Sequence, residues 1–139
     1  MIAFEVVPRQ DVHRYGIAAP KSDGDIFELA DVIEKPTAQE APSNLAIAAR
    51  YVFSPVIFDA LEQTGFGAGD EIQLTDAIRR LIDEGHRVYG MRLRNDEKRY
   101  DIGNFGAYFR AFVEFGLADE LFGADLRQHL EGLLDVDHT

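Results

Sequence analysis

The apolar residues of this chain change their spacing near residue 54, and this change constrains the fold more than any other feature of the sequence. Before it, short apolar runs are separated by turn-forming residues, a pattern typical of strands. After it, apolar residues recur at the three- and four-residue intervals of amphipathic helices. The spacing predicts strands at residues 3–7, 17–19, 26–33 and 45–53, and helices near residues 55–63, 71–84 and 104–116.

The longest apolar run in the first part of the chain covers residues 45–53, with only Arg50 interrupting it. Such a run indicates a strand buried on both faces, as in a sheet covered by helices. The strand at residues 26–33 ends before Pro36, which cannot donate to a sheet ladder. A further strand at residues 87–93 follows the second helix, so the sequence predicts an α/β fold with a mixed sheet flanked by helices.

Three helix starts are visible in the sequence. Ser54-Pro55 combines a hydroxyl N-cap with a proline suited to the first helical position. Asp70, with Gln73 three residues later, fits a variant capping box for the second helix. Asn104 fits the N-cap of the third helix. We therefore expect each helix to begin at or next to these residues.

The composition excludes several classes of protein. The chain has 139 residues and no cysteine, which rules out disulfides, thiolate catalysis, iron–sulfur clusters and cysteine zinc sites. Acidic residues outnumber basic ones by 25 to 14, and no run of Lys and Arg is longer than two residues, so we expect no nucleic-acid partner. No apolar run approaches the roughly 20 residues of a membrane span. We expect one cytoplasmic globular domain that does not bind membranes.

Three other features have simple structural explanations. The four histidines stand at no metal-ligand spacing, and we interpret them as surface residues. The loop with Gly65, Gly67 and Gly69 lacks the Lys-Ser/Thr pair of a phosphate-binding loop and does not follow a strand, so we expect a flexible turn. One face of the third helix is aromatic, and we expect it to be core: Phe105, Tyr108, Phe109, Phe112 and Phe115.

Two other places in the sequence are better candidates for a binding or catalytic site. Glu34-Lys35 stands at the carboxyl end of an apolar strand, where open α/β sheets bind ligands. A carboxylate there can accept sugar hydroxyls and an ammonium can hold a phosphate, although taken alone the pair is more simply a surface ion pair. Asp101 lies between a short extended piece and a capped helix. It fits either a magnesium ligand or a residue that caps or turns the chain.

Five motifs, in one order and with suitable gaps, carry a family resemblance. They are Arg14-Tyr-Gly-Ile17, Val32-Ile-Glu-Lys-Pro36, Ala41-Pro-Ser-Asn-Leu-Ala-Ile47, Gly69-Asp-Glu-Ile-Gln-Leu-Thr-Asp-Ala-Ile78 and Arg99-Tyr-Asp-Ile-Gly103. Together they closely resemble the second half of the bacterial UTP–glucose-1-phosphate uridylyltransferases, over about residues 3 to 118. The resemblance implies the nucleotide-diphospho-sugar transferase fold and a Mg²⁺-dependent reaction. In that reaction, the phosphate oxygen of glucose 1-phosphate attacks the α-phosphorus of UTP, UDP-glucose forms and pyrophosphate leaves.

The resemblance also implies roles for four residues of this chain. Gly16 contacts the sugar through its backbone, and Glu34 binds the glucose hydroxyls. Lys35 is the cation on the sugar-linked phosphate, which makes it both a substrate-binding and a catalytic residue. Asp101 is the magnesium ligand.

The sequence has no counterpart of the glycine-rich, arginine-containing loop with which this family opens. We therefore expect residues 1–139 to be the C-terminal, sugar-phosphate-binding part of such an enzyme, without its nucleotide-binding half and inactive alone. Strands that lack their neighbours should expose an apolar sheet edge, and we expect self-association to cover it. Two alternatives stay open: a non-catalytic oligomerisation or binding module, and the equivalent part of a thymidylyltransferase.

Overall fold

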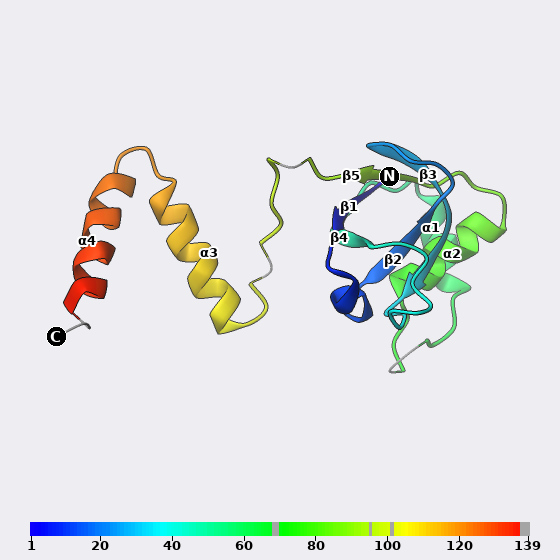
Figure 1. Cartoon of the computed structure of the whole chain (residues 1–139). Coiled ribbons are helices and arrows are strands. Elements are labelled where there is room, and N and C mark those ends of the chain that lie inside the picture. Colours follow the sequence, from blue (N-terminus) through cyan, green and yellow to red (C-terminus); the bar gives the residue numbers. More distant parts are fainter. Residues whose placement is uncertain (68–69, 95, 101, 137–139) are drawn as a thin grey trace. The chain divides into compact units, whose positions relative to one another are not determined.

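The structure is a computed structural model that describes residues 1–67, 70–94, 96–100 and 102–136. The chain divides into two compact units, Met1–Lys98 and Arg99–Thr139 (Figure 1). Among the described residues, the first unit holds five strands, one 3-10 helix and the helices α1 and α2, and the second unit holds the helices α3 and α4. This mixture of strands and helices confirms the α/β class predicted from the change of spacing.

The five strands form a mixed sheet that closes on itself in the order β1-β4-β2-β3-β5. Their bounds are β1 Ile2–Val6, β2 Gly16–Pro20, β3 Ile26–Glu34, β4 Leu45–Tyr51 and β5 Tyr89–Arg92. β5 runs parallel to β1 and antiparallel to β3, and the remaining neighbours are antiparallel. The expected open sheet edge is therefore wrong for the described strands, because the short strand β5 joins β3 back to β1.

The strand β4 lies between β1 and β2 in the closed sheet. Its first four residues are buried, whereas Ala49 and Arg50 are exposed. Here the register between β1 and β4 shifts, and Ala49 takes a left-handed backbone conformation with φ 53°. The prediction of burial on both faces therefore holds for the first half of the run only, because the irregularity turns the second half outward.

The core of the first unit lies between the sheet and the helices α1 (Val56–Glu62) and α2 (Leu74–Asp83). The rings of Phe4 and Phe27 meet at its centre, with centroids 5.5 Å apart. A Cβ on Gly90 would collide with both rings, so only glycine allows β5 to pack here. A second, smaller cluster lies beside the 3-10 helix η1 (Arg9–Arg14) and contains Val7, Val12, Ile17, Ala41 and Ala46.

The helix starts differ in part from the sequence prediction. Asn104 does cap α3, since its side chain accepts a hydrogen bond from the Ala107 backbone N–H at 2.9 Å. The capping box at Asp70 is wrong: α2 begins only at Leu74, after a Gln73 N-cap that makes no side-chain cap hydrogen bond. Asp70 has φ 57°, whereas an N-cap residue takes an extended conformation. The helix α1 begins at Val56, also without a side-chain cap.

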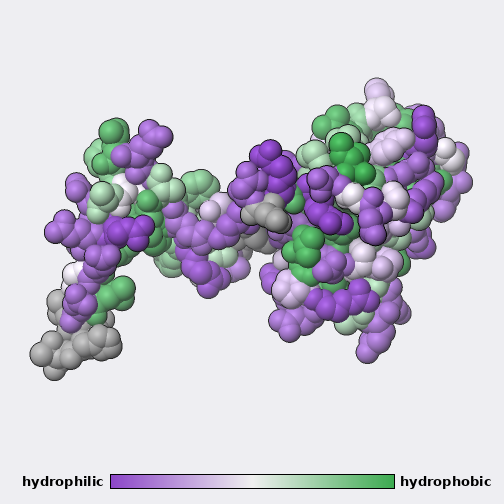
Figure 2. All heavy atoms as spheres, turned by 45° about the horizontal axis from the view of Figure 1, so that its top comes forward, coloured by the Kyte–Doolittle hydropathy of each residue, from purple (hydrophilic) through white to green (hydrophobic). Residues whose placement is uncertain are grey.

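The second unit consists of α3 (Phe105–Leu117) and α4 (Gly123–Val136), which meet where Gly116 faces Leu126. The aromatic face of α3 is exposed rather than core, from 45% at Tyr108 to 81% at Phe105. Ala111 is the one residue of α3 that is buried. The expectation of a core face is therefore wrong, because α4 alone cannot cover it within this unit. Figure 2 shows apolar surface interleaved with polar surface over these helices.

Candidate functional site

Three of the residues singled out in the sequence come together at one end of the β2–β3 hairpin. Gly16 opens β2 and is the cross-strand partner of Glu34, the last residue of β3. Lys35 follows directly, and its backbone N–H donates to the Tyr15 carbonyl oxygen at 2.9 Å. The hairpin pairing therefore places a glycine backbone, a carboxylate and an ammonium beside one another.

The Glu34 carboxylate is mostly buried, with 18% of its side chain exposed. Its Oε2 accepts a hydrogen bond of 2.6 Å from the Thr75 hydroxyl, and its Oε1 lies 3.8 Å from the Lys35 Nζ. An ionised carboxylate offers about four acceptor positions on its two oxygens. These two partners leave acceptor positions that can take hydroxyl groups of a ligand.

Lys35 combines an exposed charge with an unusual backbone. Its side chain is 57% exposed, and its φ is 45°, in the left-handed region. This conformation costs a residue other than glycine roughly 1–2 kcal/mol. Such backbones concentrate at functional sites, where the surrounding structure holds them in place. The turn at Lys35 also leads into Pro36, which ends the strand as the sequence predicts.

The lack of a side chain at Gly16 makes room for this arrangement. A Cβ there would lie 2.8 Å from Ile47 Cδ1, 3.1 Å from Glu34 Oε2 and 3.2 Å from Thr75 Oγ1. The first of these distances is too short for real atoms, and the other two are tight. The Gly16 backbone therefore lies directly against the carboxylate, where it can reach the same ligand.

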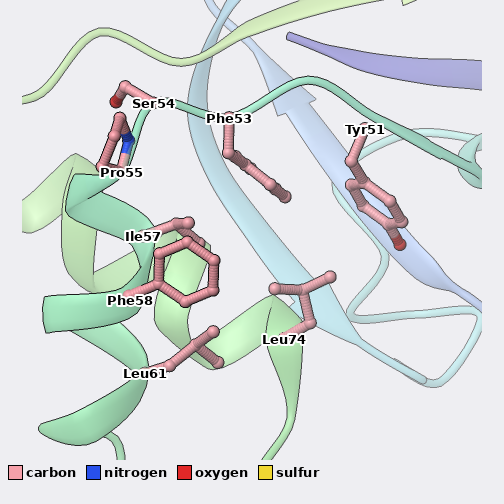
Figure 3. A pocket seen from close by; sticks show the side chains of 8 residues that line it. All are labelled: Tyr51, Phe53, Ser54, Pro55, Ile57, Phe58, Leu61 and Leu74. Carbon is pink, nitrogen blue, oxygen red and sulfur yellow. The ribbon is translucent and has the colours of Figure 1, made fainter.

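A hollow of about 420 Å³ lies between the end of β4 and the helices α1 and α2. Figure 3 shows aromatic rings from the β4 side facing the apolar side chains of the two helices. The residues that line it are Tyr51, Phe53, Ser54, Pro55, Ile57, Phe58, Leu61 and Leu74. The hollow is almost wholly apolar, so it can accommodate an apolar group but offers few polar contacts.

Tyr51 connects this hollow electrostatically to Glu34. Burial raises the pKa of the Tyr51 hydroxyl above its ordinary value, and the negative charge of Glu34 raises the pKa further. Its ring also stacks on Phe53, with centroids 5.4 Å apart. Tyr51 and Thr75 were both missed as site residues by sequence reasoning, although Thr75 stands inside the Gly69–Ile78 motif. A tyrosine or a threonine does not by itself indicate a site in a sequence. Only the fold shows that these two residues interact with Glu34.

The predicted magnesium ligand, Asp101, lies outside the described residues. Across residues 1–67, 70–94, 96–100 and 102–136, no group of three or more His, Asp or Glu side chains is placed to hold a metal ion. Within the same residues, no helix is long and apolar enough to cross a membrane.

Comparison with known proteins gives consistent matches. A family model described as nucleotidyl transferase matches residues 1–116. The chain is 43% identical over 138 residues to the UTP–glucose-1-phosphate uridylyltransferase of Bacillus subtilis (strain 168). That alignment covers 99% of this chain and 46% of the relative. The chain is 42% identical over 131 residues to the protein of that name from Haemophilus ducreyi, covering 91% of this chain and 43% of the relative. The chain spans less than half the length of these relatives.

Solved structures agree with these matches. A UDP-glucose pyrophosphorylase complexed with UDP-glucose superposes with a TM-score of 0.75 at 35% identity, covering 82% of this chain and 42% of the other. A UTP-bound UGPase from Acinetobacter baumannii superposes with a TM-score of 0.79 at 32% identity, covering 93% of this chain and 44% of the other. The fold of this chain is therefore part of the fold that these proteins share.

Proposed function

Because this chain belongs to the nucleotidyl transferase family, we propose that it forms the sugar-phosphate-binding, C-terminal half of a UTP–glucose-1-phosphate uridylyltransferase. The observation that carries the proposal is the meeting of Gly16, Glu34 and Lys35 at one end of the β2–β3 hairpin. The substrates are proposed from the names of the relatives. The three residues offer a backbone, a carboxylate and an ammonium, which suit the acceptor substrate glucose 1-phosphate.

Each of the three residues has a proposed part in binding glucose 1-phosphate. Glu34 accepts hydrogen bonds from glucose hydroxyls with the acceptor positions that Thr75 and Lys35 leave. The Gly16 backbone lies against the sugar, where a side chain would intrude. The exposed Lys35 ammonium faces the phosphate, whose charge it balances.

The proposed reaction is a displacement at phosphorus. An oxygen of the glucose 1-phosphate attacks the α-phosphorus of UTP, a new P–O bond forms, and the bond from the α-phosphorus to the bridging oxygen breaks. Pyrophosphate leaves with the electron pair of that bond. Lys35 holds the attacking phosphate in place and offsets the repulsion between the two anionic phosphates, so its contribution is positioning and electrostatics.

Mg²⁺ is part of this proposal through Asp101 alone. One carboxylate together with substrate phosphates is a common magnesium environment. Because Asp101 lies outside the described residues, its role rests on the resemblance of Arg99-Tyr-Asp-Ile-Gly103. Bound there, Mg²⁺ would offset the negative charge of the substrate phosphates. A cytoplasmic location likewise stays a prediction.

A chimera tests the proposed function. The 138 aligned residues of this chain replace the aligned 46% of the Bacillus subtilis relative, and pyrophosphate release from UTP and glucose 1-phosphate is measured in the presence of Mg²⁺. We expect turnover from the chimera and none from the isolated 139-residue chain, which should bind UDP-glucose at most in the ~millimolar range. A folded chimera without turnover contradicts the proposal.

We also propose that the chain self-associates through the exposed aromatic face of α3, defined by Phe105, Tyr108, Phe109, Phe112 and Phe115. Exposed apolar patches of this kind mark interaction surfaces. The same face is what favours the second candidate function, a non-catalytic oligomerisation module. An inactive chimera together with a stable oligomer of the isolated chain would support that second function.

A further inference from the structure

Thr75 is the one buried polar side chain among the residues that the structure describes, with 6% of its surface exposed. It lies in the first turn of α2, and its hydroxyl donates to Glu34 Oε2 at 2.6 Å. The two residues are 41 positions apart in the sequence, so the contact depends on the packing of α2 against β3. A hydroxyl buried this deeply needs a partner, because an unsatisfied polar group in the interior is costly.

The hydrogen bond fixes one oxygen of the carboxylate. With Oε2 held by Thr75, the other oxygen, Oε1, is the one that lies nearer to the Lys35 ammonium, at 3.8 Å. Hydrogen bonds with one charged partner are stronger than bonds between neutral groups. Thr75 therefore determines which way the two oxygens of Glu34 face.

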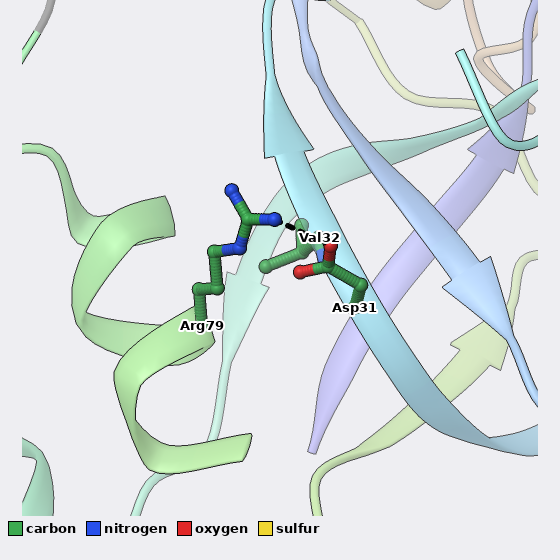
Figure 4. Close-up of polar contacts among 3 residues, drawn as sticks. All are labelled: Asp31, Val32 and Arg79. Carbon is green, nitrogen blue, oxygen red and sulfur yellow. Dashed lines mark hydrogen bonds and ion pairs between the residues drawn. The ribbon is translucent and has the colours of Figure 1, made fainter. Parts of the chain in front are cut away.

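A second polar bridge fastens the same helix to the same strand. Arg79, one helical turn after Thr75, donates to Asp31 Oδ2 at 2.8 Å (Figure 4). The other oxygen of Asp31 accepts from the Val32 backbone N–H at 2.7 Å. Both contacts join α2 to β3, and with them the Thr75 hydroxyl lies opposite the end of the strand.

We propose that Thr75 is a positioning residue, which holds the Glu34 carboxylate in the orientation that binds the sugar hydroxyls. This inference deepens the proposed function and rests on it for the identity of the ligand. Thr75 itself does not touch the reacting atoms. Its loss should weaken sugar binding in the ground state and the transition state equally, which raises KM and leaves kcat unchanged.

The first test uses the active chimera. Thr75→Val removes the hydroxyl at nearly constant volume, and Thr75→Ser keeps it. The control is Thr64→Val, because Thr64 also donates its hydroxyl, at 2.7 Å, but to the Ala60 carbonyl oxygen of α1. For Thr75→Val we expect a rise of about tenfold in KM for glucose 1-phosphate, with KM for UTP and kcat within about twofold of the parent. Thr75→Ser and Thr64→Val should keep the parental values.

A second test needs no activity and no ligand. In the isotopically labelled 139-residue chain, three-bond couplings report whether the Glu34 side chain keeps one rotamer. We expect one rotamer in the parent and in Thr75→Ser, and averaging among rotamers in Thr75→Val, with Thr75→Ala as a second variant if the valine does not fold.

The outcomes separate the two proposals. An unchanged rotamer in a folded Thr75→Val chain overturns the positioning role, and so does an unchanged KM for glucose 1-phosphate. A fall in kcat together with a similar rise in KM for both substrates would indicate that Thr75 is merely structural. That result would also overturn the positioning role. An inactive chimera contradicts the proposed function alone, because the rotamer measurement still decides the role of Thr75.

Discussion

Gly16 and Glu34 face each other across the β2–β3 hairpin, and the missing side chain of Gly16 is what lets the Glu34 carboxylate meet the Thr75 hydroxyl. A Cβ at position 16 would approach the Ile47 side chain, the carboxylate and the hydroxyl at the same time. The hairpin thus places the Gly16 backbone directly beside the Glu34 carboxylate, where the proposed function has both of them contact the sugar.

Gly16→Ala should therefore damage the site and cost about 1–3 kcal/mol of folding free energy, as inserted methyl groups do in tightly packed places. The matched control is Gly65→Ala, because a Cβ on Gly65 meets nothing within 4 Å. Urea unfolding of the 139-residue chain measures both variants. Equal stability of Gly16→Ala and Gly65→Ala would contradict the close packing described for Gly16.

Ala49→Gly should stabilise the chain. Ala49 has φ 53° in the irregular part of β4, a conformation that costs an alanine roughly 1–2 kcal/mol. Glycine relieves this strain but adds a backbone-entropy cost of about 0.5–1 kcal/mol, so we expect a net gain of about 0.5–1 kcal/mol in the free energy of unfolding. Ala48→Gly, at a buried position of the same strand, should destabilise instead. A loss of stability in Ala49→Gly would show that the left-handed conformation is not strained.

Tyr51 should make stability depend on pH in alkaline solution. Because burial and the Glu34 charge raise its pKa in the folded chain, Tyr51 holds its proton more tightly when folded than when unfolded. The free energy of unfolding should then fall as the pH rises from the ordinary tyrosine pKa of about 10 to the raised pKa of Tyr51. Urea unfolding of the parent and of Tyr51→Phe at several alkaline pH values isolates this contribution.

Glu34→Gln should lower the pKa of Tyr51 but leave it above the ordinary value, since burial is the larger cause of the shift. The ultraviolet absorbance of tyrosinate, compared with that of Tyr51→Phe, follows this titration. A Tyr51 pKa that Glu34→Gln does not change would remove the electrostatic link between the hollow and the carboxylate.

The aromatic face of α3 gives a prediction about assembly. We expect the 139-residue chain to sediment as an oligomer, and Phe112→Glu to shift it to a monomer, because a charge on a covered apolar face is costly. Phe58→Glu is the matched control, since Phe58 on α1 and Phe112 on α3 are both 66% exposed. A parent chain that is monomeric at high concentration would contradict the proposed self-association.

Local patterns in the sequence predicted most elements of this fold, because strands and helices leave their own apolar spacing. The position of Glu34-Lys35 at the carboxyl end of such a strand was also predictable, because Pro36 follows the pair and stops the strand. Spacing along the chain could not predict the closure of the sheet, which depends on β5 meeting both β1 and β3, far away in sequence. The contact of Thr75 with Glu34 could not be predicted either, because the two residues are 41 positions apart in the sequence.

The exposure of the α3 aromatic face could not be predicted from the sequence for a different reason. A stripe such as Phe105, Phe109 and Phe112 shows which face of a helix is apolar, but the stripe does not show whether another element covers that face. Among the described residues of the second unit, α4 is the only helix beside α3, and the face stays open.

A comparison of two lysines in the chimera tests the proposed sugar-phosphate site most directly. Lys35 and Lys21 are similarly exposed, at 57% and 51%, and each stands near a glutamate. Lys21, however, forms its ion pair with Glu28 across the base of a hairpin turn and away from the proposed site. With UTP and glucose 1-phosphate saturating, Lys35→Ala should lower pyrophosphate release by about 10²–10³-fold, the usual cost of one preorganised charge-stabilising group. Lys21→Ala should keep parental turnover, and near-parental turnover in Lys35→Ala would contradict the proposed sugar-phosphate site.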